Sequence, residues 1–155
     1  MKIISGGQTG ADRAALDVAL ELHIECGGFC PKGRKSEDGM IPEKYPLIET
    51  ATEEYSERTG LNIKEADATF VLIDRQADKG TLLTIELCKT HNKKLMEADL
   101  SGRVDDKQVV QWILNNKITI LNIAGSRETS SPGIYEKAYR LLRKVMIEIV
   151  ARNLM

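Results

Sequence analysis

The sequence predicts one three-layer α/β domain in which helices flank a mainly parallel central sheet. Runs of β-branched and apolar residues alternate with segments of helical periodicity along the whole chain. The run 68–73 is apolar on both faces, as expected of a parallel strand that helices cover on each side. No repeat, low-complexity segment or linker divides the chain, so we expect residues 1–155 to form a single domain.

The chain begins with a strand, a glycine-rich turn and a helix. Residues 3–4 are β-branched and predict a buried strand, and apolar residues between 15 and 22 recur at the spacing of one helix face. Small and polar residues lie between them: Gly6, Gly7, Gln8, Thr9, Gly10 and, at the start of the helix, Asp12. Such a turn directs backbone N–H groups and the positive end of the helix dipole at one point. A simple connection needs one glycine, so three glycines favour the binding of phosphate or another oxyanion.

A long polar loop follows a short predicted strand at 26–30. Residues 31–42 contain two prolines, two glycines, three cations and two acids. A loop of this length is usually functional or mobile. It is either a solvated loop or a lid over the glycine turn. As a lid, it would direct the cations Lys32, Arg34 and Lys35 at an anion.

The middle of the chain predicts a second strand–turn–helix unit. The strand 68–73 ends in a polar loop, and a helix begins at Gly80 and Thr81. This helix N-terminus can bind an anion, although a capping turn explains it almost as well. Four further elements complete this part of the chain: an edge strand at 47–50, a helix capped by Thr52, a strand at 94–97 and a helix around 109–114.

The third unit joins the longest strand signal to the last helix. Residues 118–124 run into a turn that contains Gly125, Ser126 and Arg127, and the following helix carries an apolar stripe from 138 to 150. Such a stripe is typical of a core face. Parallel strands end at one edge of their sheet, and ligands bind at that edge. The three turns therefore leave the sheet where a ligand is expected.

Composition excludes several classes of function. The chain has 22 Lys and Arg against 23 Asp and Glu, and this balance argues against a charge-driven nucleic-acid binder. An aromatic content of 5% leaves few platforms on which single-stranded bases could stack. The two histidines have no second ligand at metal spacing, so we expect no metal site.

The cysteines and the apolar runs indicate where in the cell the protein is expected. An odd count of three cysteines without a C-x-x-C pair indicates a reduced, intracellular protein, and we expect it in the cytoplasm. The N-terminus lacks the pattern of a signal peptide, and no apolar run approaches the roughly 20 residues that span a membrane. We therefore expect no membrane association.

The turns together resemble a known family. Residues 5–16 are similar to the S-G-G-x-x-G-x-D-x-x-A-L stretch of the bacterial DNA-processing protein A family, and residues 80–84 are similar to its G-S-L-x-T series. That family has a G-S-R turn before the S-G-G turn, whereas here it lies near the end, at 125–127. The order is circularly permuted, which close chain termini allow. The permuted arrangement resembles the molybdenum carrier family, a branch of the Rossmann-like SLOG superfamily. The matching stretches are residues 4–20, 31–34, 37–39, 41–42, 55, 58–59 and 122–135.

The resemblance implies a Rossmann-like sheet with a pocket for a phosphorylated small molecule, either a nucleotide or the molybdenum cofactor. It implies that the turns 5–12 and 125–127 are neighbours at the centre of the sheet, with Arg127 as a fixed cation. It also implies a homo-oligomer. Related phosphoribohydrolases carry P-G-G-x-G-T-x-x-E, in which the glutamate serves catalysis. Here Thr84 stands at that position and Glu86 follows two residues later, on a different helix face.

Three functions stay open at this point. A carrier or sensor would bind its phosphorylated ligand without transforming it. A nucleotide-processing hydrolase would need a carboxylate near the ribose, and Asp12, Glu86 and Glu128 are candidates that also have structural explanations. A single-stranded nucleic-acid module has the least support, because the net charge is −1 and aromatic residues are few.

Overall fold

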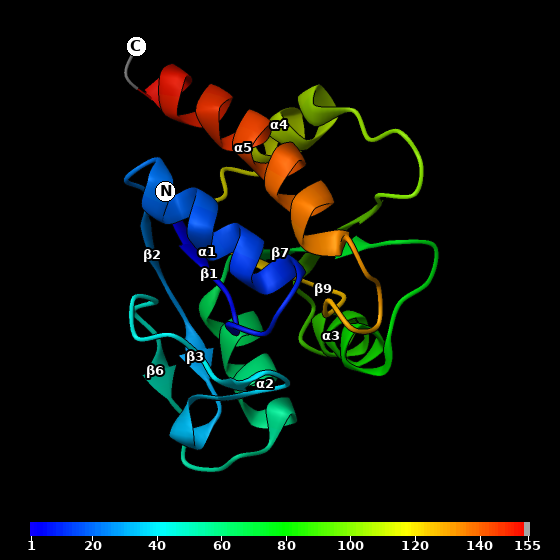
Figure 1. Ribbon diagram of the computed structural model, residues 1–155. Coiled ribbons are helices and arrows are strands. Elements are labelled where there is room, and N and C mark those ends of the chain that lie inside the picture. Colours follow the sequence, from blue (N-terminus) through cyan, green and yellow to red (C-terminus); the bar gives the residue numbers. More distant parts are fainter. Residues whose placement is uncertain (154–155) are drawn as a thin grey trace.

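The computed structural model describes residues 1–153, in which helices cover both faces of a five-stranded sheet (Figure 1). The elements of this layered unit are β1 (Lys2–Ile4), α1 (Ala11–Glu21), β2 (Glu25–Gly27), α2 (Tyr55–Glu65), β7 (Ala68–Ile73), α3 (Lys79–Thr90), β8 (Lys94–Asp99), α4 (Asp106–Asn115), β9 (Ile120–Gly125) and α5 (Ile134–Asn153). The strand order is β2-β1-β9-β7-β8, and all four pairings are parallel. The predicted three-layer α/β architecture is confirmed.

The two faces of the sheet differ in chemistry. Helices α1, α4 and α5 cover one face, where Phe70 of β7 and Leu121 of β9 belong to the main hydrophobic core (Figure 1). Helices α2 and α3 cover the other face. There the alternation of strand side chains presents Thr69 and Asn122, both buried, and the Asn122 amide donates to the Thr69 hydroxyl at 3.2 Å. The second face thus has a polar floor beneath α2 and α3.

The segment between α1 and α2 forms two small additional sheets. Strands β3 (Phe29–Cys30) and β6 (Ile48–Glu49) pair in parallel, and β4 (Lys35–Ser36) and β5 (Gly39–Met40) form an antiparallel hairpin after a 3₁₀ turn at Lys32–Arg34. The prediction of a single strand at 26–30 is wrong, since the chain leaves the central sheet at Gly28 and forms two separate strands, β2 and β3. This residue has a φ of 123°, and a side chain here would meet the Ser5 carbonyl at 2.3 Å.

The start of α2 also differs from the prediction. Glu54 is the N-cap and the helix begins at Tyr55, three residues after the predicted cap. The Thr52 hydroxyl instead donates to Glu57 and accepts from the amide of Glu54 at 3.2 Å. Thr52 therefore organises the turn before the helix, because its side chain finds partners in that turn.

The first and last turns are neighbours, as the permuted order predicts. Strands β1 and β9 pair directly, with Ile4 opposite Asn122. Beyond them the Ala11 amide donates to the Ser126 carbonyl at 3.2 Å. Gly10 allows this approach, because its φ is 82° and an added Cβ would lie 2.4 Å from that same carbonyl oxygen. Within residues 1–153 no helix has the length and apolar character needed to cross a bilayer.

Candidate functional site

A pocket of about 670 Å³ lies between α2 and α3, over the carboxyl-terminal end of β9. Asn122 and Ala124 of β9 contribute to its lining. The walls come from the first glycine turn, both helices and the last turn, and include Gly6, Gln8, Asp12, Tyr55, Arg58, Thr59, Asn62, Asp78, Lys79, Gly80, Thr81, Thr84, Glu86, Gly125 and Arg127. Its position at the carboxyl ends of the central strands is where open α/β sheets bind ligands.

A buried ion pair lies beneath the glycine turn. The Arg58 guanidinium is 3.5 Å from the Asp12 carboxylate and donates to the Gly6 carbonyl at 2.8 Å. Only 7% of Arg58 and 6% of Asp12 is exposed. Burial raises the pKa of Asp12 to about 6, although Arg58 and the amide of Gln8 lower it in part. Burial likewise lowers the pKa of Arg58.

Three cations gather around one aromatic ring at the pocket wall. Tyr55 has Lys35 at 5.2 Å, Arg58 at 5.3 Å and Arg127 at 5.5 Å from its ring centre. These residues come from the long loop, from α2 and from the last turn. Contacts of this kind hold cations over a ring face. Three cationic groups therefore lie around Tyr55 at this wall of the pocket.

Two carboxylates of the protein accept hydrogen bonds from backbone amides that the sequence analysis expects to bind an anion. Asp12 accepts from the Gln8 amide at 3.1 Å. Asp78 caps α3, where it accepts from the Thr81 amide at 2.9 Å, and its second oxygen accepts from the Arg127 amide at 3.1 Å. The start of α3 is thus a capping turn. Anion binding in the pocket has to rely mainly on side chains.

The predicted site residues divide into three groups. Seven line the pocket: Gly6, Gln8, Asp12, Gly80, Thr81, Gly125 and Arg127. Four lie in the same turns without lining it: Gly7, Thr9, Gly10 and Ser126. The loop cations Lys32 and Arg34 lie outside the pocket. The structure therefore brings the first and last turns together but leaves these two cations apart.

Arg34 organises the long loop from within. Its guanidinium donates to the carbonyls of Ile41 at 3.0 Å, Pro42 at 2.7 Å and Tyr45 at 2.8 Å. A positive charge in a loop was expected to face an anion, but a guanidinium fork satisfies backbone carbonyls equally well. Of the three loop cations, Lys35 comes nearest to the pocket, through its contact with Tyr55.

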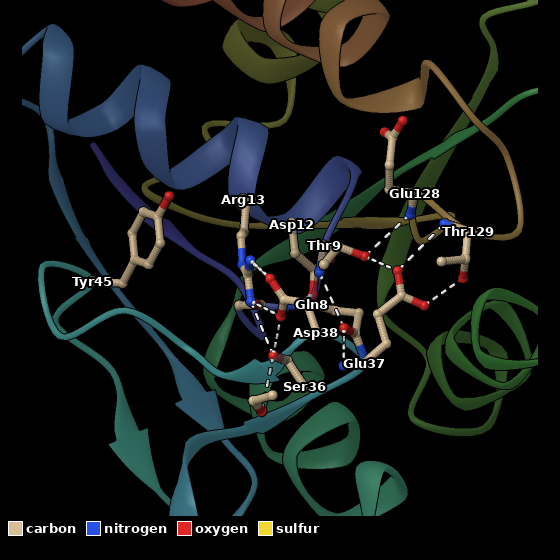
Figure 2. Close-up of polar contacts among 12 residues, drawn as sticks. Gln8, Thr9, Asp12, Arg13, Ser36, Glu37, Asp38, Tyr45, Glu128 and Thr129 are labelled. Carbon is tan, nitrogen blue, oxygen red and sulfur yellow. Dashed lines mark hydrogen bonds and ion pairs between the residues drawn. The ribbon is translucent and has the colours of Figure 1, made fainter.

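The acidic residues of the loop fold it over the first turn (Figure 2). Arg13 of α1 holds the Asp38 carboxylate with bonds of 2.5 and 2.7 Å and donates to the Ser36 hydroxyl at 3.0 Å. Hydrogen bonds from Arg13 lower the pKa of Asp38 to about 2. At neutral pH this ionised pair therefore attaches the hairpin β4–β5 beside the glycine turn.

One buried amide group at the site has no partner. The Gln8 carbonyl oxygen accepts from the amides of Thr9 at 3.1 Å and Glu37 at 3.0 Å, whereas its Nε2 is buried and makes no hydrogen bond. Gln8 is 5% exposed and lines the pocket. Buried donors without a partner are rare and costly. An acceptor atom on a ligand would satisfy this group.

Sequence reasoning did not assign Tyr55, Arg58 or Asn122 to the site. A signal existed for Asn122, which interrupts the apolar run of β9. Arg58 and Asn62 are one helical turn apart and both buried, although charged and amide residues on a helix usually face water. Sequence periodicity alone cannot separate these buried polar residues from a solvated face.

A parallel sheet covered by helices on both faces, with a pocket at the carboxyl ends of its central strands, defines a Rossmann-like α/β fold. The chain belongs to the circularly permutated YpsA SLOG family, whose model matches residues 3–146. It is similar to the crystal structure of a protein from Syntrophus aciditrophicus SB described as a putative molybdenum carrier protein. Identity is 41%, over 93% of this chain and 92% of that chain, with a TM-score of 0.86. No curated protein matches the sequence.

Proposed function

We propose that the chain is a carrier or sensor that binds a phosphorylated small molecule in the pocket between α2 and α3. The observation that carries this proposal is the unpartnered Gln8 Nε2, a donor buried in the lining of a pocket that also contains Arg58 and Arg127. Guanidinium groups suit phosphate oxygens because their donors form a rigid fork. A phosphate-bearing ligand would therefore meet both a cation and a free donor.

The ligand class includes nucleotides and the molybdenum cofactor. The similar crystal structure is described as that of a putative molybdenum carrier protein. In residues 1–153 no group of three or more His, Cys, Asp or Glu residues could hold a bare metal ion. Molybdenum inside a phosphorylated organic cofactor would be held through the phosphate of that cofactor, by donors such as Gln8 and Arg127.

The charge of the pocket favours a single phosphate. Its lining contains three cations, Lys79, Arg58 and Arg127, and four acids, Asp12, Glu54, Asp78 and Glu86. A triphosphate would meet more like charge than the cations offset. AMP, which combines one phosphate with a polar heterocycle, is therefore a suitable probe.

Replacing Arg127 by alanine should weaken AMP binding about tenfold or more, because a charge-assisted hydrogen bond to phosphate contributes about 1.5–3 kcal/mol. Isothermal titration calorimetry measures the change. Arg140→Ala is the matched control, since Arg140 is exposed on α5 and pairs with Glu136 of the same helix. Equal AMP affinity in the Arg127→Ala variant and the wild type would remove Arg127 from the site.

A hydrolase is the second candidate, favoured by the position of Asp12. This residue lines the pocket with a pKa raised to about 6, which suits proton transfer near neutral pH. Glu86 and Thr84 also line the pocket, although their spacing predicted different helix faces. Glu128 lies outside the lining and accepts from the amides of Gly133 and Tyr135 at the start of α5. Chromatography of the AMP samples distinguishes a hydrolase from a carrier, because only a hydrolase would release adenine from AMP.

A further inference from the structure

The hairpin β4–β5 places a carboxylate among hydrogen-bond donors from both ends of the chain (Figure 2). Glu37 accepts from the hydroxyls of Thr9 and Thr129 and from the Thr129 amide at 3.3 Å. The Arg127 guanidinium lies 3.6 Å from the same carboxylate. Two hydroxyls, an amide and a guanidinium form a donor set that suits a carboxylate and a phosphate equally. We call Thr9, Thr129 and Arg127 the oxyanion seat.

Polar contacts hold the hairpin on this seat. Of residues 35–40, only Ser36 is buried, and Met40 is 61% exposed. The Arg13–Asp38 pair, the bond from Arg13 to the Ser36 hydroxyl and the bond from the Glu37 amide to Gln8 add to the attachment. Lifting the hairpin would expose little apolar surface, and water can replace its hydrogen bonds. The hairpin can therefore leave the seat at a small cost in free energy.

Glu37 differs in this respect from the other carboxylates near the turns. Asp12 belongs to α1, and Asp78 caps α3. Either carboxylate could withdraw only if a helix end that packs on the sheet were disturbed. Glu37 lies instead between two strands of two residues each. Among these three acids, Glu37 is the one that an incoming anion can replace.

Two residues connect the seat with the pocket. Arg127 pairs with Glu37 and also lines the pocket. Gln8 also lines the pocket, and its carbonyl oxygen accepts from the Glu37 amide, whereas its buried Nε2 has no partner. A ligand that engages the Arg127 guanidinium from the pocket therefore competes with Glu37 for it, whereas a bond to Gln8 Nε2 would leave the Gln8–Glu37 bond in place.

We propose that Glu37 fills the oxyanion seat in the free protein and that a phosphate monoester displaces it, which lifts the hairpin. The proposal rests on the proposed function, because Arg127 serves both the pocket and the seat. One anion replaces another in this exchange, so Arg127 keeps an anionic partner throughout.

Replacing Glu37 by glutamine removes the internal competitor while it keeps the side chain's size. Inorganic phosphate and AMP should then bind about tenfold tighter, since the seat is free in a larger fraction of molecules. Asp38→Asn, which loosens the hairpin without changing the seat, should act in the same direction. Glu43→Gln is the control, because it makes the same charge change at an exposed position directly after the loop. Calorimetry measures each affinity.

Hydrogen exchange of the amides in residues 35–40 provides a second readout. AMP should accelerate exchange there in the wild type, and exchange in the Glu37→Gln variant should be fast without ligand. Slower exchange on AMP binding, or no gain in affinity in Glu37→Gln and Asp38→Asn, would contradict the proposed displacement of Glu37 from the oxyanion seat. If AMP still binds and Arg127→Ala still weakens it, the pocket survives and only the seat is refuted. Absence of AMP binding in the wild type and all variants would refute both.

Discussion

Replacing Arg58 by methionine should lower the free energy of unfolding by about 3 kcal/mol at pH 8, as expected when one partner of a buried ion pair is removed. The variant leaves the Asp12 carboxylate buried without its cation and the Gly6 carbonyl without its donor at 2.8 Å. Methionine retains most of the apolar volume, so the loss reports mainly on charge. Urea unfolding at pH 5 and pH 8 measures it.

The pH dependence identifies the cause of this loss. The pKa of Asp12 is raised to about 6 from an ordinary value near 3.8, so its ionisation destabilises the folded state as pH rises between these values. Without Arg58 the folded pKa moves higher still, and the deficit of the variant should grow from pH 5 to pH 8. A second change, Asp12→Asn, should recover part of the loss. A deficit below about 1 kcal/mol, or one independent of pH, would contradict the buried pair.

Replacing Gly10 by alanine should cost about 3 kcal/mol or more of unfolding free energy. Gly10 has a φ of 82° and a ψ of −128°, which side chains scarcely tolerate, and its Cβ would lie 2.4 Å from the Ser126 carbonyl oxygen. The first and last turns would have to separate. Urea unfolding measures the cost, and amide spectra should show changes in both turns.

The matched control is Gly60→Ala in the interior of α2. A side chain at Gly60 meets nothing within 4 Å, and alanine favours a helix over glycine. This variant should gain about 0.5–1 kcal/mol. Similar stability of the two variants would show that the close approach at Gly10 does not hold the turns together.

Much of the fold could be predicted from local patterns. The strand predicted at 68–73 is β7 with the same bounds, because a continuous β-branched and apolar run leaves few alternatives. The last helix was predicted from 138, whereas α5 begins at Ile134. Periodicity marks the packed face, but the first turn of α5 depends on Glu128, whose carboxylate accepts from the amides of Gly133 and Tyr135.

The candidate site could be predicted only in part. The adjacency of the turns at 5–12 and 125–127 followed from the family resemblance and is confirmed. The role of Glu37 was not predictable, since its partners Thr9 and Thr129 lie 28 and 92 residues away along the chain. The prediction that Arg34 contacts a ligand rested on its positive charge. In the fold its guanidinium donates to backbone carbonyls instead, and only the tertiary structure shows which of the two partners it meets.

The position of AMP in a crystal structure of the complex tests the ligand pocket most directly. We predict that the phosphate lies within hydrogen-bonding distance of the Arg127 guanidinium and that an acceptor atom of AMP meets Gln8 Nε2. AMP bound outside the pocket between α2 and α3, or bound there with its phosphate away from Arg127, would contradict the proposed function.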